Sequence, residues 1–229
     1  MKHVKNLVVG CGLSGAVIAE RIASELNEDV LIIDAKDHIG GNIYDYKDQN
    51  GITVHKYGSH IFHTNLENVW RYLCRFTDFN TYMHRVIAVI DGIETHIPFN
   101  IKTLYDVFPQ SMAQRLEEKL LKKFEYNKKV PILEFQKQDD NELKFLANYV
   151  YEKVFLHYTT KQWGMKPSDV DGAVTARVPV FIGCDDRYFQ DKYQGIARGG
   201  YTAMVQKIIN NPKIKLQLST SFDDIKNEI

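Results

Sequence analysis

The sequence predicts an α/β protein whose main part is a doubly wound, Rossmann-like domain that binds a dinucleotide. Three observations indicate this fold: a glycine-rich turn that joins an apolar strand to a helix, an acidic residue at the end of the next apolar run, and a second pair of glycines soon after it. In folds of this kind parallel strands alternate with helices, and the diphosphate of the ligand lies at the amino end of the first helix.

The first strand is expected over residues 5–9, and the glycine-rich turn follows it directly. The turn has the pattern G-x-G-x-x-G. Its first glycine permits a tight turn, the second lets the backbone approach a pyrophosphate, and the third lets a helix over residues 15–26 pack closely on the strand. The residues assigned to the cofactor site are Gly10, Gly12, Leu13, Ser14 and Gly15.

The second strand, over residues 30–33, ends at Asp34. A carboxylate at this spacing after the turn accepts hydrogen bonds from ribose hydroxyls, so Asp34 and the adjacent Ala35 are assigned to the same site. The next signal, Gly40-Gly41-Asn42, favours FAD over NAD, because a second glycine pair is where the longer phosphate chain of a flavin would pass. An ordinary surface turn is the alternative for the glycine pair alone. Gly41 and Asn42 are accordingly predicted to contact FAD.

The middle of the chain is expected to leave the strand–helix alternation. Apolar spacing predicts an amphipathic helix over residues 67–79. Alternation around Asp91-Gly92 predicts an antiparallel hairpin over residues 86–97. Residues 104–124 and 133–155 are expected to be mostly helical, with prolines at the boundaries.

Residues 164–200 combine prolines, glycines and aromatic residues without helical periodicity, and a helix over 201–209 and a strand over 214–218 follow. We expect an FAD-binding Rossmann-like domain, an antiparallel sheet with the substrate cleft, and an inserted helical domain. These parts are residues 1–80 with 201–229, residues 81–98 with 164–200 including a mobile loop at 168–184, and residues 99–163. Because an FAD-binding fold of this type commonly needs further strands, the chain is expected to be truncated.

Composition excludes several classes of function. Lysine plus arginine equals aspartate plus glutamate at 29 each, so nothing indicates binding to nucleic acid or to an anionic membrane. No run approaches the ~20 apolar residues of a membrane span. The three cysteines are too scattered for a disulfide framework or a zinc site, and a reducing cytoplasm is the expected location. His55, His60 and His63 lack a nearby residue that would complete a metal shell, so no metal is predicted.

Several longer sequence motifs follow one another along nearly the whole chain. The two most specific are Tyr57-Gly58-Ser59-His60-Ile61-Phe62-His63-Thr64 and Tyr158-Thr159-Thr160-Lys161-Gln162-Trp163-Gly164. Shorter strings lie at residues 38–42, 176–180, 185–189, 193–195 and 200–204. Together they resemble the bacterial UDP-galactopyranose mutases. The resemblance implies a flavoprotein isomerase of galactofuranose and glycan biosynthesis, which interconverts UDP-galactopyranose and UDP-galactofuranose through a covalent adduct of reduced FAD, without net redox.

The resemblance also implies roles for individual residues. His60, with Ile61, is implied to lie beside the flavin ring, and His60 and Arg177 are the implied catalytic residues. Arg177 matches an arginine on a mobile loop that closes over the substrate diphosphate. The implied substrate-binding residues, which include the aromatic pair on the uridine side, are Tyr158, Thr159, Gln162, Trp163, Arg177, Tyr188 and His84.

Three positions depart from the family pattern. His84 stands where an asparagine is common, Phe181 where a second loop arginine is common, and Ala197 where a proline is frequent. These departures concern the placement of the substrate rather than the flavin site. In the family, the region beyond residue 229 carries a further essential arginine, so a protein of these residues alone is expected to lack turnover.

Two other functions stay open at this point. One is an FAD-dependent oxidoreductase with an amine-oxidase-like fold, against which the uridine-type string around Trp163 argues. The other is a non-catalytic fragment that binds FAD or a UDP-sugar. The sequence leaves the physiological reductant and the oligomeric state undecided, with a homodimer as one option.

Overall fold

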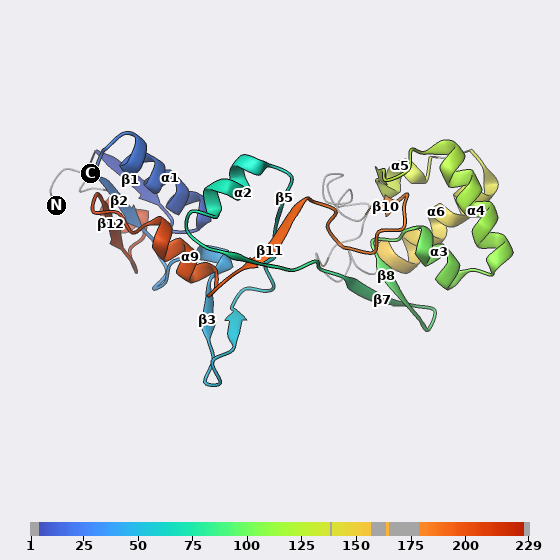
Figure 1. Cartoon of the computed structure of the whole chain (residues 1–229), viewed down its shortest axis with the longest axis horizontal. Helices are drawn as coiled ribbons and strands as arrows, with labels where there is room; N and C mark the ends of the chain where they lie inside the picture. The colour runs from blue at the N-terminus through green and yellow to red at the C-terminus, as the bar shows by residue number, and fades with distance from the viewer. Residues whose placement is uncertain (1–4, 138, 157–163, 165–178, 227–229) are drawn as a thin grey trace. The chain divides into compact units, whose positions relative to one another are not determined.

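The computed structural model describes residues 5–137, 139–156, 164 and 179–226. The chain divides into two compact units, one of residues 1–82 with 191–229 and one of residues 83–190. Figure 1 shows the elements of each unit. Among the helices of the described residues, none combines the length and the apolarity that crossing a bilayer requires.

The first unit contains the predicted parallel sheet. Its strands are β1 (Asn6–Val9), β2 (Val30–Ile33) and β12 (Ile214–Gln217), in the order β1-β2-β12. Asn6 and Ile214 both pair with Val30 in parallel register, so the strand expected near the end of the chain joins the same parallel sheet as the first two strands. Two helices complete this part, α1 (Leu13–Glu25) and α9 (Tyr201–Ile208).

Helix α1 packs on the sheet through its smallest side chains. Ala16 and Ala19 are completely buried, and they share a core with Ile32 of β2 and Val205 of α9. Alanine at these positions allows the helix axis to lie close to the strands, which brings the start of the helix to the end of β1. The strand–turn–helix unit predicted from the glycine pattern is therefore confirmed.

Helix α2 (Glu67–Leu73) is shorter than the sequence predicts. The prediction extended the helix to Phe79, but this residue opens strand β6 (Phe79–Thr81). Phe79 pairs with Ala197 of β11 (Tyr193–Ala197), and this pairing requires an extended backbone. Local apolar spacing does not record a partner so distant in the sequence, which explains the error.

Strand β11 also pairs with β5 (Phe62–Thr64), so the antiparallel sheet has the order β5-β11-β6. A separate hairpin is formed by β3 (Asp45–Lys47) and β4 (Thr53–His55). The first unit also contains a 3-10 turn, η1 (Gly41–Ile43), and a short helix, α10 (Phe222–Ile225).

The second unit begins with the predicted hairpin of β7 (Val86–Ile90) and β8 (Ile93–Ile97). Asp91 and Gly92 have φ values of 51° and 84°, as the two central residues of a type I′ turn require. A two-stranded sheet of β9 (Lys129–Val130) and β10 (Val180–Phe181) lies in the same unit.

Helices form most of the rest of the second unit in the part of it that the structure describes. They are α3 (Ile101–Val107), α4 (Gln110–Lys123), α5 (Ile132–Phe135), α6 (Asn141–Val150) and the π-helical turn η2 (Tyr151–Leu156). Pro109 separates α3 from α4, because the residue before a proline is driven out of the helical region; Phe108 has φ −118° and ψ 152°. Leu116 and Leu146 are completely buried and join α4 to α6 in one core.

The three-part domain division stays a prediction, and the observed clustering groups the residues differently. Strand β11 falls in the first unit because it pairs with β5 and β6. The hairpin of β7 and β8 falls in the second unit together with the helices, since Ile90 and Ile97 belong to the core that Leu116 and Leu146 also form.

Candidate dinucleotide site

The glycine-rich turn at the start of α1 leaves the first N–H groups of the helix without a side-chain cap. Gly12 occupies the N-cap position, its own lack of a side chain excludes a cap bond, and the first turn carries no acidic residue. The N–H groups at a helix start point outward and carry the positive end of the helix dipole. Leu13 and Ser14, the first two helical residues, therefore present their backbone to an anion.

The three positions of this turn are occupied by glycine for different physical reasons. Gly10 has φ +99°, and its N–H donates a 2.7 Å hydrogen bond to the carbonyl oxygen of Ile33. A Cβ atom on Gly15 would overlap the carbonyl oxygen of Gly10, so this position needs glycine for packing. A Cβ atom on Gly12 would meet only the Cα of Gly41, at 3.9 Å. Gly12 thus faces open space, which a ligand can fill.

The second glycine pair packs against the first turn. The N–H of Gly40 donates a 2.8 Å hydrogen bond to the carbonyl oxygen of Cys11, and Gly12 and Gly40 form a parallel β-bridge. Gly41 has φ +55°, and a Cβ atom there would lie 3.0 Å from the Cα of Gly12. The structure therefore gives this pair a structural reason that the sequence analysis did not consider. Asn42, beside it, is exposed, and its contact with FAD stays a prediction.

Asp34, which directly follows β2, stabilises the same turn. One carboxylate oxygen accepts a 2.6 Å hydrogen bond from the N–H of Cys11, and the other accepts a 2.9 Å bond from the N–H of Lys36. The side chain is almost buried, and the following Ala35 is exposed. Binding of a ribose by Asp34 and Ala35 stays a prediction, and it would use the oxygen lone pairs that these two bonds leave.

Cys11 packs inside the turn. It is completely buried, and burial raises the pKa of its thiol to about 11, with the charge of Asp34 acting in the same direction. A thiol with this pKa stays protonated at neutral pH and is a poor nucleophile.

His60 lies on the segment that leads into β5. Its backbone N–H donates a 3.0 Å hydrogen bond to Nδ1 of His55, and its own Nε2 is buried without a hydrogen-bond partner among the described residues. A buried polar nitrogen without a partner is costly and marks a place where a ligand can complete the hydrogen bonding. His63 instead pairs with Asp191 at 2.8 Å. Among the described residues no group of three or more histidine, cysteine and acidic side chains is arranged to hold a metal ion.

Most of the implied substrate residues lie outside the described residues; they are Tyr158, Thr159, Gln162, Trp163 and Arg177. The two that are described, His84 and Tyr188, lie together in the second unit. The N–H of Tyr188 donates a 2.7 Å hydrogen bond to the carbonyl oxygen of His84, and their rings meet edge to face at 5.9 Å. Asp186 holds this segment through ion pairs with Arg85 and Lys102 at 3.0 and 3.2 Å.

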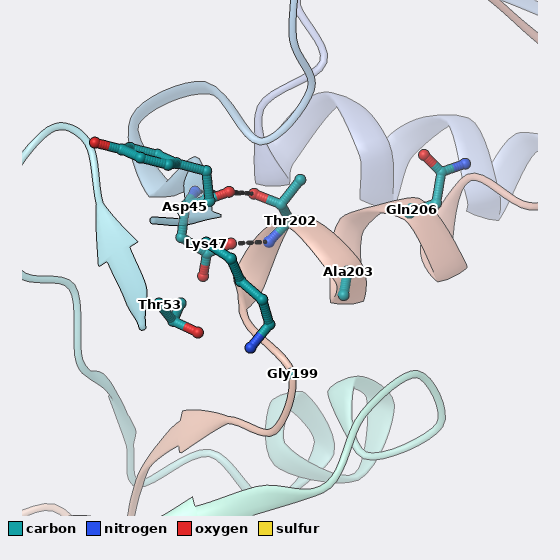
Figure 2. Close-up of a pocket in the computed structure, with 8 residues that line it drawn as sticks. Asp45, Lys47, Thr53, Gly199, Thr202, Ala203 and Gln206 are labelled. Atoms are coloured by element: carbon teal, nitrogen blue, oxygen red, sulfur yellow. Dashed lines mark hydrogen bonds between the residues drawn. The ribbon is translucent and has the colours of Figure 1, made fainter. Parts of the chain in front are cut away.

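Sequence analysis missed the role of Asp45. Its carboxylate accepts hydrogen bonds from the N–H groups of Tyr201 and Thr202, at 2.6 and 2.9 Å, and so caps helix α9 from a distant strand. Figure 2 shows the bond from Thr202. The Thr202 hydroxyl bonds to the backbone of Asp45 in return. Gly200 has φ +99°, and a Cβ atom there would lie 2.7 Å from the carboxylate. This contact with Asp45 explains the Gly200-Tyr201-Thr202 string. The string was the one signal in the sequence that could have indicated a special role for the start of α9.

An open pocket of about 340 Å³ lies beside this cap, in the first unit. Figure 2 shows its lining, which includes Lys47, Thr53 and Gln206. The Lys47 side chain already donates to the carbonyl oxygen of Gly51, and each carboxylate oxygen of Asp45 already accepts a hydrogen bond from the start of α9. Lys47, Asp45 and Thr202 thus serve the fold here, and we place the candidate site at the glycine turn instead.

Comparison with known proteins agrees with a dinucleotide fold and adds a family. Residues 8–76 match the family model of an NAD(P)-binding Rossmann-like domain, and residues 153–229 match the family model of UDP-galactopyranose mutase. A probable UDP-galactopyranose mutase of Klebsiella pneumoniae is 37% identical over 97% of this chain and 57% of its own length. A dTDP-fucopyranose mutase of Escherichia coli is 39% identical over 93% of this chain and 56% of its own length.

Solved structures show the same fold. A crystal structure of reduced UDP-galactopyranose mutase matches 94% of this chain and 48% of its own chain, with a TM-score of 0.59 and 17% identity. The chain thus spans little more than half the length of the curated relatives that it matches.

Proposed function

Because the chain belongs to the UDP-galactopyranose mutase family, we propose that it is part of an FAD-dependent isomerase that interconverts UDP-galactopyranose and UDP-galactofuranose. The observation that supports this most directly is the corner at Gly12, where uncapped helix N–H groups face open space beside a second glycine pair. The positive end of the helix dipole and the free N–H groups at this corner suit a diphosphate.

The described residues fit FAD at two places. The start of α1 would hold the diphosphate through backbone N–H groups near Gly12, Leu13 and Ser14, and Asp34 keeps the turn in shape. The buried Nε2 of His60, which has no partner in the described part of the chain, would supply a hydrogen-bonding atom for the flavin ring. When bound in its reduced form, FAD supplies the electron pair that attacks the anomeric carbon of the sugar, so the protein itself needs no nucleophile.

The substrate would be held by residues of the second half of the chain. Tyr158 and Trp163 would stack on the uracil with Thr159 and Gln162 at its polar edge, and Arg177 would fork onto two phosphate oxygens of the diphosphate. His84 and Tyr188, which the structure brings together, would contact the sugar and the phosphate. Such contacts would keep the departing UDP close enough to return to the sugar.

A second substrate pair has a specific observation in its favour. A relative of similar identity is named a dTDP-fucopyranose mutase, so the nucleotide and the sugar are both open within one reaction type. A uracil and a thymine differ by one methyl group, and a hydrophobic pocket discriminates such a pair only by about 10–200-fold. Substrate identity therefore has to be measured rather than argued from the fold.

The direct test titrates the chain with FAD and then incubates the reduced, FAD-loaded protein separately with UDP-galactofuranose and with the dTDP-fucofuranose counterpart. Formation of the pyranose without consumption of reductant supports the proposal, and the better substrate identifies the nucleotide and the sugar. An oxidised sugar would favour the amine-oxidase-like alternative. Binding of FAD and UDP without conversion would identify the 229-residue form as binding-competent and inactive.

A Trp163→Ala variant checks the substrate side. We expect it to weaken UDP binding by about 1–3 kcal/mol while FAD affinity stays unchanged, because an aromatic ring stacked on the uracil would contribute much of the binding energy. Equal UDP affinity in the variant and the parent would remove Trp163 from the proposed site.

A further inference from the structure

We propose that His55 and Tyr201 form a two-point clamp on the backbone of residues 60–62, and that His55 thereby acts as a positioning residue for the cofactor-facing His60. The inference rests on the proposed function, since it assumes that His60 meets the flavin. It concerns side chains that the sequence analysis had assigned to no cofactor or substrate site: a histidine at the end of β4 and a tyrosine at the start of α9.

The first point of the clamp is a hydrogen bond to a specific ring nitrogen. The N–H of His60 donates to Nδ1 of His55 over 3.0 Å. A ring nitrogen that accepts a hydrogen bond carries no proton, so His55 is neutral here and its proton is on Nε2. The His55 ring also lies edge-on to the ring of Tyr201, with 5.5 Å between centroids, so packing fixes its orientation.

The second point is the hydroxyl of Tyr201. It accepts a 3.0 Å hydrogen bond from the N–H of Phe62 and lies 3.4 Å from the carbonyl oxygen of Gly195, to which it donates. Tyr201 is 3% exposed, and burial raises the pKa of its hydroxyl to about 12, so it keeps the proton that it donates. Its own N–H is held by Asp45 at 2.6 Å, which fixes the tyrosine to the capped start of α9.

The two bonds act on alternate residues of one short segment. The backbone of His60 is held by β4 and that of Phe62 by α9, so Ile61 between them cannot turn independently. Within the described ranges of the chain, the buried Nε2 of His60 has no hydrogen-bond partner in this arrangement, although rotation of an unclamped segment could bring it to solvent. The clamp thus holds a polar atom in a costly position, which is how a binding site is pre-organised.

The test compares two substitutions of His55. In His55→Asn the amide oxygen can occupy the place of Nδ1 and accept the bond, whereas His55→Leu removes the acceptor and keeps an apolar side chain. Tyr201→Phe removes the second point. Tyr72→Phe is the matched control, because it also deletes a hydrogen bond of a partly buried tyrosine hydroxyl, 2.7 Å to Glu20, but on helix α2.

Two measurements are made on each variant of the 229-residue chain: amide hydrogen exchange at residues 60 and 62 without FAD, and the affinity and visible absorption spectrum of FAD on titration. We expect His55→Leu to speed exchange at residue 60 and to raise the Kd for FAD by about tenfold each, the value of one hydrogen bond. The flavin band should shift in this variant, His55→Asn should restore all three properties, and Tyr72→Phe should change none.

Three outcomes would overturn the inference. Unchanged exchange at residue 60 in His55→Leu would show that the bond does not hold the segment. Faster exchange with unchanged FAD affinity and spectrum would show that the clamp serves the fold alone. If the parent chain binds no FAD while the exchange pattern is as expected, the clamp exists but the proposed function fails, and the positioning role fails with it.

Discussion

The sharpest prediction concerns alanine substitutions of two glycines in one turn. One variant should lose FAD binding and keep its stability, and the other should lose stability. Alanine at Gly12 adds a methyl group that meets only the Cα of Gly41 at an ordinary 3.9 Å. The backbone of Gly12, at φ −73° and ψ 179°, suits alanine. Alanine is a poorer N-cap than glycine, but it lowers the entropy of the unfolded chain, so the free energy of unfolding should change by no more than about 1 kcal/mol.

The same methyl group stands where the diphosphate of FAD would approach. It would keep the phosphate oxygens from the first N–H groups of α1, and each such charge-assisted hydrogen bond is worth about 1.5–3 kcal/mol. Loss of even one corresponds to roughly 10–150-fold weaker binding of FAD. Gly12→Ala should therefore fold normally and lose its flavin.

Gly15→Ala should behave in the opposite way. Its methyl group would overlap the carbonyl oxygen of Gly10 and crowd the Val8 side chain, both in the interior of the strand–helix contact. Relief requires movement of α1, at a cost of about 3 kcal/mol. Urea unfolding and FAD fluorescence titration measure both variants. A Gly12→Ala protein that binds FAD as tightly as its parent, or a Gly15→Ala protein of parental stability, would refute the reasoning.

Three further predictions concern charged side chains. Asp45→Ala should lower the free energy of unfolding by about 2 kcal/mol, because two N–H groups of α9 lose their cap, and Asp45→Asn should cost less. Burial would raise the pKa of Glu20, but hydrogen bonds from an arginine and a tyrosine outweigh it and lower the pKa to about 2, from 4.5. The stability that Glu20 contributes should therefore disappear as the pH falls from about 4.5 to about 2. In urea unfolding at a series of pH values, the free energy of unfolding of Glu20→Gln should change less with pH over this range. Asp186→Asn should weaken UDP binding several-fold and leave FAD affinity unchanged, as calorimetry can check, because Arg85 and Lys102 lose the carboxylate that anchors the substrate-side segment.

The parts of the fold that sequence alone could predict are those with local causes. The strand, turn and helix around Gly12 follow from glycine spacing and apolar runs within a few residues, and all three appear where expected. Asp91-Gly92 and Pro109 act through their own φ preferences, so the hairpin and the helix break are also local effects.

The parts that could not be predicted depend on partners far along the chain. Helix α2 ends early because Phe79 is recruited as a strand by β11, more than a hundred residues later. Asp45 caps a helix that begins at Tyr201, and no periodicity in either segment records this contact. For the candidate site, the pattern predicted a turn that the structure forms and named Asp34, but it did not reveal that Asp34 holds the turn through the N–H of Cys11, or that His55 holds the backbone of His60.

The second glycine pair shows why this difference matters for function. As a sequence signal, Gly40-Gly41 indicated room for the phosphate chain of a flavin. In the structure, a side chain at Gly41 would press on the Cα of Gly12 at 3.0 Å, and its φ of +55° already disfavours other residues. Glycine at position 41 is therefore required for the loop to close on the turn, whether or not FAD is present. Gly12 and Gly41 face each other in this corner, and the fold explains why position 41 is glycine but not why position 12 is. The close approach of a ligand is the physical reason that remains for Gly12.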